Sequence, residues 1–205
     1  MHATVAPRGS LAQFRGLLAL MRPRQWVKNA FVFAPLIFAG EFLKLESIEK
    51  VLLAALIFCV ASSATYILND LSDIERDRRH PKKSQTRPLA SGLVSVPQAL
   101  LLLFTLYAVL LAAWFVMPAV LYVVLGYLLL NLAYTFVLKH QPVIDIFTIA
   151  LGFVLRVYAG AMALSVPVSS WMFVTTLCLA LYLAAVKRGQ ELASNGSESR
   201  EVLQH

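Results

Sequence analysis

The feature that most constrains this chain is a series of apolar runs long enough to cross a membrane. A transmembrane helix needs about 20 mostly apolar residues. Six segments reach or approach that length: 26–41, 48–68, 97–116, 118–138, 142–164 and 169–186. Pro97, Pro118 and Pro142 stand at the starts of three of them, where the missing N–H costs no helical hydrogen bond. The pattern predicts an all-α, polytopic transmembrane helix bundle with about six spans.

The composition argues against other broad classes of protein. Of the 205 residues, 59% are hydrophobic and 14% are charged, whereas soluble domains average about 45–50% and about 25%. One soluble core of this size cannot bury that surplus. In a soluble protein the net charge of +7 would suggest a nucleic-acid partner. Here we attribute it to basic residues at a membrane face, so we expect no nucleic-acid partner. Cys59 and Cys178 both lie in apolar runs and predict no disulfide framework.

The basic residues predict how the chain is oriented. If the N-terminus is cytoplasmic, nearly all of the 18 Lys and Arg residues fall on the cytoplasmic side. Only Lys44 and Lys50 fall outside, and Arg156 lies within a span. This distribution follows the positive-inside rule. The long connection 69–96 is rich in charge, so we expect an active site to open on the cytoplasmic side.

An acidic cluster follows the second apolar run. Asp70, Asp73 and Asp77 lie at i, i+3 and i+7, so they share one face if the helix continues, with Asn69 beside Asp73. Carboxylates so close repel each other without a cation, and hard oxygen ligands suit Mg²⁺ bound with a substrate phosphate. A solvated, capped helix end is the alternative. The helix dipole disfavours acids at a C-terminal end, so we interpret the cluster as a Mg²⁺ and diphosphate site.

Cations follow the acidic cluster along the chain. Lys83 and Arg87 could neutralise the charge of a departing diphosphate, and Arg can bind two of its oxygens at once. A basic loop lying on anionic lipid headgroups is the alternative. Because the acidic cluster is adjacent, we favour the phosphate-binding interpretation.

These segments resemble a known family. Residues 69–77 match the N-D-x-x-D-x-x-x-D motif of the UbiA superfamily of intramembrane prenyltransferases. Residues 22–29 are similar to the R-P-x-Q-W-x-K-N opening of its decaprenyl-phosphate phosphoribosyltransferase branch, which includes rhizobial nodulation-linked relatives. Segments 134–145, 152–160 and 187–192 also fit that branch. The resemblance covers about 21–192.

The resemblance also implies a domain organisation. It predicts a basic, amphipathic N-terminal segment at 1–25, a UbiA-like membrane domain at 26–192 and a polar tail at 193–205. The family normally has nine transmembrane helices, so this chain is expected to lack the last three.

The implied function is a membrane-bound transferase. It would move 5-phosphoribose from phosphoribosyl pyrophosphate to a polyprenyl phosphate with Mg²⁺. The product would lead towards lipid-linked arabinose donors for envelope polysaccharide or nodulation factors. The expected location is the bacterial inner membrane, and a homo-oligomer is possible.

The resemblance further implies roles for individual side chains. Asp70, Asp73 and Asp77 are expected to be catalytic and to bind the metal. The expected substrate-binding residues are Lys28, Asn69, Lys83, Arg87, Tyr134, Lys139, Asp145, Arg156, Lys187, Arg188 and Glu191. Several have structural alternatives, such as an interfacial tyrosine or a snorkelling lysine. Arg156 falls near mid-membrane, so it should face the bundle interior and a partner.

Three other functions remain open. One is an ordinary prenyltransferase that moves an isoprenoid from its diphosphate to an aromatic ring. The place of its second aspartate motif holds Lys187, Arg188 and Glu191 instead, which argues against it. Another is a truncated, non-catalytic membrane relative. A transporter is disfavoured because the carboxylates cluster near one membrane face rather than at the midplane.

Overall fold

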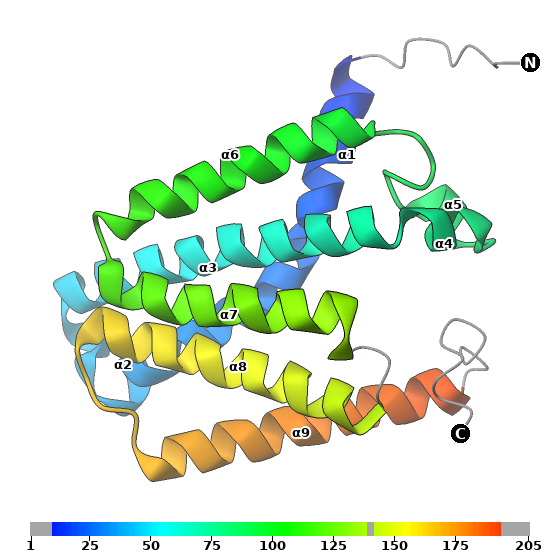
Figure 1. Cartoon of the computed structure of the whole chain (residues 1–205). Coiled ribbons are helices and arrows are strands. Elements are labelled where there is room, and N and C mark those ends of the chain that lie inside the picture. Colours follow the sequence, from blue (N-terminus) through cyan, green and yellow to red (C-terminus); the bar gives the residue numbers. More distant parts are fainter. Residues whose placement is uncertain (1–9, 139–141, 194–205) are drawn as a thin grey trace, which may run out of the picture.

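The fold is a bundle of helices (Figure 1). The computed structural model describes residues 10–138 and 142–193, and within that part every regular element is helical. The elements are α1 (Ser10–Met21), η1 (Pro23–Phe33), α2 (Ala34–Phe38), η2 (Glu41–Leu43), α3 (Leu45–Ser72), α4 (Ile74–Arg79), α5 (Lys83–Thr86), α6 (Val96–Trp114), α7 (Pro118–Phe136), α8 (Pro142–Leu164) and α9 (Ser170–Ala193). The predicted all-α class is confirmed.

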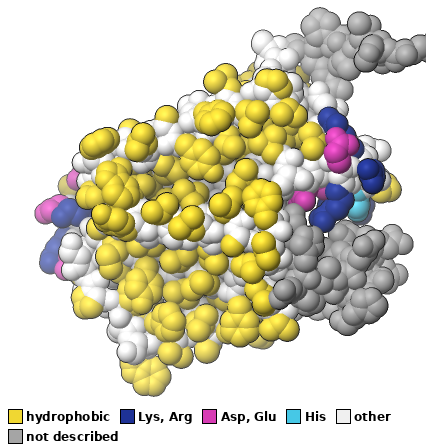
Figure 2. Space-filling view, viewed as in Figure 1, with side chains coloured by type: hydrophobic (Ala, Val, Ile, Leu, Met, Phe, Trp, Pro, Cys, Tyr) yellow, Lys and Arg dark blue, Asp and Glu magenta, His cyan; other side chains and the backbone are white. Residues whose placement is uncertain are grey.

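In the described residues, five helices are long and apolar enough to cross a membrane: α3, α6, α7, α8 and α9. Figure 2 shows charged side chains at the two ends of the bundle and an apolar band between them. Large apolar side chains are exposed along this band, including Leu101 on α6 and Tyr182 on α9. Exposed apolar surface of this extent is what a lipid environment accommodates, so the chain is a multi-pass membrane protein.

The first predicted span, 26–41, is not a spanning helix. The chain there forms the 3₁₀ segment η1 and then the short helix α2. Runs of 3₁₀ helix rarely exceed about 3–4 residues, whereas η1 has 11. Irregular backbone at membrane depth is tolerated where neighbouring protein buries it. The expectation of about six spans is therefore corrected to five in the described part of the chain.

Small residues on two helices allow η1 to enter the bundle. The helix α3 contributes Ser62 and Ser63, both buried, and Ser63 accepts a hydrogen bond from Trp26 Nε1 at 3.0 Å. On α8, a Cβ atom at Gly160 would lie only 1.9 Å from the Val32 carbonyl oxygen. The close approach of η1 to α8 therefore requires glycine at position 160.

The starts of the long helices follow the expected signals. Pro118 and Pro142 begin α7 and α8, as the sequence predicts. The helix α6 begins with a capping box in which Ser95 accepts from the backbone of Gln98, and Pro97 lies in its first turn. At each helix start, the unpaired backbone N–H groups are either bonded by a capping side chain or absent because the residue is proline.

Helix α3 positions the polar part of the molecule. It packs against α1, η1, α6, α7 and α8. Beyond its C-terminal end lie α4 and α5, at the same end of the bundle as the end of α7, the start of α8 and the end of α9 (Figure 1). We call this the polar end. The opposite end carries η2 and the start of α3, with the ion pair between Glu41 and Lys44.

Candidate functional site

The aspartates of the acidic cluster lie where α3 passes into α4. The expected continuous helix is interrupted at Asp73, whose ψ of 5° separates the two helices. Ser72 Oγ donates to the Asn69 carbonyl at 2.8 Å, a local side-chain bond of the kind that competes with helical hydrogen bonding. The interruption leaves Asp70 and Asp77 buried, while Asp73 is only partly buried.

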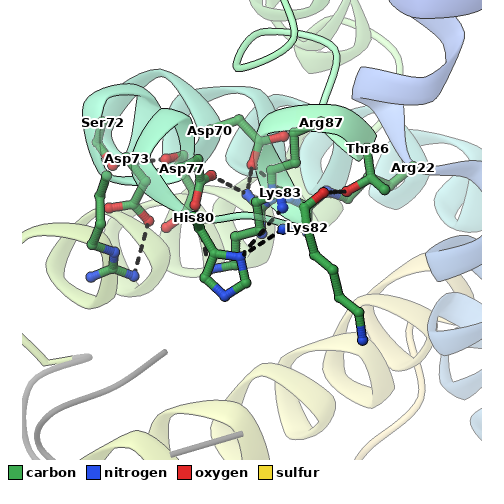
Figure 3. A network of polar contacts seen from close by, with 12 residues as sticks. Arg22, Asp70, Ser72, Asp73, Asp77, His80, Lys82, Lys83, Thr86 and Arg87 are labelled. Atoms are coloured by element: carbon green, nitrogen blue, oxygen red, sulfur yellow. Dashed lines mark hydrogen bonds and ion pairs between the residues drawn. The ribbon is translucent and has the colours of Figure 1, made fainter. Parts of the chain in front are cut away.

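Asp70 and Asp77 share one cation. Arg87 Nη1 forms an ion pair with Asp70 Oδ1 and lies 3.0 Å from Asp77 Oδ2. Lys83 Nζ lies 3.3 Å from Asp77 Oδ1. Figure 3 shows the side chains of Lys83 and Arg87 directed at the two carboxylates. The structure thus brings together four of the residues that the sequence selected.

Arg22 completes this cluster and was not among the expected site residues. Its Nη2 donates to Asp70 Oδ1 at 2.5 Å, and its guanidinium lies 5.0 Å from the centre of the Tyr66 ring. Its backbone is left-handed, with φ of 52°, a conformation that non-glycine residues rarely adopt. Arg22 opens the motif at 22–29, which is the sequence signal that could have identified it.

The third aspartate does not join the other two. Asp73 Oδ2 lies 4.0 Å from Arg76 Nη2, and Asn69 is half-buried in the last turn of α3. Among the described residues, no group of three His, Cys, Asp or Glu side chains is arranged to hold a metal. In the described structure Asp70 and Asp77 therefore form a buried pair apart from Asp73, and metal binding by all three aspartates stays a prediction.

The buried pair still suits a divalent cation. Asp77 Oδ2 is buried and accepts no hydrogen bond from the described residues, because its 3.0 Å contact with Arg87 Nη1 is an ion pair without hydrogen-bond geometry. Mg²⁺ commonly binds through one or two carboxylates and completes its octahedron with water and substrate phosphate. Asp70 and Asp77 supply that donor set, and Lys83 and Arg87 now provide the positive charge between them.

A second buried ion pair lies between α8 and α9 at the polar end. Arg188 Nε donates to Asp145 Oδ2 at 2.5 Å, and the two residues are 5% and 1% exposed. Both were expected to bind substrate, and the structure pairs them with each other. This pair joins the first turns of α8 to the last turns of α9.

The remaining expected residues have different positions. Tyr134 is half-buried on α7, and Lys187 is exposed on α9. Lys139 lies outside the described residues, and Glu191 lies among those whose side chains are not described.

Lys28 in η1 lies in a positively charged environment. Partial burial, together with the charges of Lys187, Arg156 and Arg22, lowers the pKa of its amine to about 8, and burial is the largest cause. These cations come from α9, from α8 and from the residue before η1. A group of cations drawn from three parts of the fold is suited to an anion such as phosphate.

Arg156 faces the bundle interior, as expected for a charged residue within a span. It is 5% exposed. Its guanidinium donates to Asn29 Oδ1 at 2.8 Å, to the Gly152 carbonyl at 2.7 Å and to the Tyr127 hydroxyl at 3.2 Å. Contact of Arg156 with substrate stays a prediction.

Comparison with known proteins shows what this chain is similar to. The model of the UbiA prenyltransferase family matches residues 30–191. The chain is 39% identical over 182 residues to the decaprenyl-phosphate phosphoribosyltransferase of Mycolicibacterium smegmatis, covering 86% of this chain and 57% of that protein. It is 33% identical over 175 residues to the nodulation protein NoeC of Azorhizobium caulinodans, covering 83% and 55%. It therefore spans somewhat more than half the length of these curated relatives.

A solved structure shares the fold. It is that of a UbiA homolog from Archaeoglobus fulgidus bound to GPP and Mg²⁺, with a TM-score of 0.72 and 22% identity. The likeness covers 92% of this chain and 67% of that one.

Proposed function

The chain belongs to the UbiA prenyltransferase family, and from this premise we propose that it transfers 5-phosphoribose from phosphoribosyl pyrophosphate to a polyprenyl phosphate. The observation that carries the proposal is the buried pair Asp70 and Asp77 with Lys83 and Arg87 beside it. The name of the Mycolicibacterium smegmatis relative supports the choice of substrates. The polar end is then the cytoplasmic end, in a bacterial inner membrane.

The reaction needs positioning and charge neutralisation more than a protein nucleophile. An oxygen of the lipid phosphate attacks the anomeric carbon of the ribose, and the bond from that carbon to the diphosphate oxygen breaks. When bound, Mg²⁺ neutralises charge that develops on the diphosphate. Asp70 and Asp77 would hold the ion, and Lys83 and Arg87 would then be available to bind the phosphate oxygens of the diphosphate.

The cations around Lys28 bind the second phosphate of the reaction, which is the phosphate of the lipid acceptor. Lys28 and Lys187 lie near each other, since the charge of Lys187 lowers the pKa of the Lys28 amine. An ordinary prenyltransferase would need carboxylates for a second Mg²⁺ near 187–191, whereas two of the residues there are basic. This arrangement favours a phosphorylated acceptor over an aromatic one. The pair Asp145 and Arg188 sets how α8 and α9 meet beside it.

Transfer can be tested directly with the 205-residue chain. Membranes containing it are given radiolabelled phosphoribosyl pyrophosphate, Mg²⁺ and decaprenyl phosphate, and the lipids are then extracted. We expect label in the lipid fraction that disappears when a chelator removes the Mg²⁺. Parallel membranes carrying the Mycolicibacterium smegmatis relative serve as the positive control.

The outcomes separate the competing functions. Absence of lipid label, with the relative active in the same assay, would refute the proposal and favour a non-catalytic member. Transfer from a labelled prenyl diphosphate to an aromatic acceptor, without transfer of phosphoribose, would identify an ordinary prenyltransferase.

Lys28 is expected to make this activity depend on pH. Its amine is charged below a pKa of about 8 and neutral above it, and only the charged form attracts phosphate. Because kcat/KM reports the free enzyme, we expect kcat/KM to fall as the pH rises through about 8. In Lys28→Arg the charge persists to higher pH, so this fall should vanish. A wild-type kcat/KM that stays level between about pH 7 and about pH 9 would contradict the assignment.

A further inference from the structure

Arg156 is a buried cation whose partners in the described structure are uncharged. Its hydrogen bonds go to an amide oxygen, a backbone carbonyl and a phenol. Its guanidinium also lies between 5.0 and 5.4 Å from the ring centres of Tyr127, Phe153 and Phe58. None of the ion pairs found between described residues includes Arg156. A charge within a span is costly, so its contacts should serve a purpose.

One of those contacts reaches Asn29 of η1. The side-chain oxygen of Asn29 accepts from Arg156 Nε at 2.8 Å. Its Nδ2 donates to Ser62 Oγ at 3.3 Å and to Cys59 Sγ at 3.2 Å on α3. Asn29 is therefore held from both sides, by α8 through its oxygen and by α3 through its nitrogen. Among the described residues, no other side-chain hydrogen bond joins η1 to α8.

The face of α8 that meets η1 is built for this approach. Gly152, Arg156 and Gly160 lie at i, i+4 and i+8, so they share one face of the helix. The carbonyl of Gly152 accepts from Arg156 Nη1 at 2.7 Å, which directs the guanidinium along the helix. The absence of a side chain at Gly160 lets the Val32 carbonyl lie against α8. Arg156 and Gly160 lie about one helical turn apart, and both contact η1.

We infer that Arg156 is a positioning residue that, through Asn29, holds the 3₁₀ segment η1. Held in this way, η1 directs Lys28 towards Lys187 and Arg22. The inference rests on the proposed function only for the use that Lys28 serves. A 3₁₀ segment of 11 residues has poorer hydrogen-bond geometry than an α-helix, so a side-chain contact in its middle has a large influence on its path. Lys28 immediately precedes Asn29, so the backbone that Asn29 anchors also sets where the Lys28 side chain leaves η1.

The placement of Lys28 can be measured without any substrate. The charged groups that face its amine are Lys187 of α9, Arg156 of α8 and Arg22 before η1. Competitive labelling with acetic anhydride, read by mass spectrometry of the peptide that contains Lys28, gives the pH midpoint of its reactivity. For the full chain in lipid nanodiscs we expect a midpoint of about 8.

One variant and two controls separate the position of Lys28 from the charge of Arg156. Asn29→Ala retains the charge of Arg156 but removes its contact with η1, and we expect the Lys28 midpoint to rise by about one unit or more towards its ordinary value. Ser62→Ala removes a bond from Asn29 to α3 and leaves the bond to Arg156, so the midpoint should not move. Tyr127→Phe removes a bond of Arg156 that does not reach η1, and serves as a second control.

The result that would overturn the inference is an unchanged Lys28 midpoint in folded Asn29→Ala. A wild-type midpoint near 10.5 would overturn it as well, because Lys28 would then not face the other cations. If the midpoints shift as expected while the wild-type chain transfers no phosphoribose, the positioning role stands and the proposed function fails. The labelling and the transfer assay therefore test the two proposals separately.

Discussion

Replacement of Asp77 by Asn is expected to lower kcat/KM for phosphoribosyl transfer by about 100-fold or more, since removal of one group that stabilises transition-state charge costs about that factor. Asp77 is 2% exposed and is within ion-pair distance of both Lys83 and Arg87. The amide cannot bind a divalent cation as a carboxylate does. The loss is measured as Mg²⁺-dependent label transferred to lipid at several Mg²⁺ concentrations.

The control for this variant lies on the same short helix. Glu75 of α4 is exposed and pairs with Arg78 away from the buried carboxylates, so Glu75→Gln removes a similar charge without touching the site. We expect Glu75→Gln to keep wild-type activity, because exposed ion pairs contribute little. Asp77→Asn with wild-type activity at every Mg²⁺ concentration would disprove the metal assignment. Equal amounts of both variants in the membrane would exclude a difference in insertion.

Replacement of Gly160 by Ala is expected to displace η1 and to destabilise the protein by about 3 kcal/mol, the upper end of typical overpacking costs. A Cβ atom there would lie 1.9 Å from the Val32 carbonyl oxygen. That neighbour is backbone, so the conflict cannot be relieved by a side-chain rotation. The variant is compared with wild type by thermal unfolding of the detergent-solubilised chain.

Gly126 provides the matched control. It lies within α7, and a Cβ atom there would meet nothing within 4 Å. Gly126→Ala should therefore be neutral or slightly stabilising, by up to about 1 kcal/mol. Trp26 of η1 donates a hydrogen bond to Ser63 of α3. In a chain that retains Trp26 as its sole tryptophan, a change in its fluorescence would therefore report that η1 has moved. Equal stability of the two variants, with unchanged Trp26 fluorescence, would show that η1 does not pack against α8 as described.

Much of the fold could be predicted from local signals. Hydropathy over about 20 residues identified the five spanning helices, and proline located the starts of α7 and α8. The same signals failed at 26–41. Hydropathy reports whether a segment is removed from water, and η1 is partly buried by protein. It does not report whether the backbone within such a segment is α-helical.

The candidate site shows the same division. The proximity of Lys83 and Arg87 to Asp77 could be predicted because only a short connection separates them. The contact between Arg22 and Asp70 joins residues 48 positions apart. The break at Asp73 could not be predicted from the spacing of the aspartates, because that spacing assumes one uninterrupted helix.

The order of residues thus determined that this chain spans a membrane and that acids and bases meet at one end of it, because both follow from local apolar runs and neighbouring charges. Only the tertiary structure decided which carboxylates share a cation, and that Arg156 contacts Asn29 across 127 positions. The contact between Arg156 and Asn29 depends on how closely α3 and α8 approach η1. That distance is set by small side chains such as Ser63 and Gly160, whose effect appears only when the helices pack together.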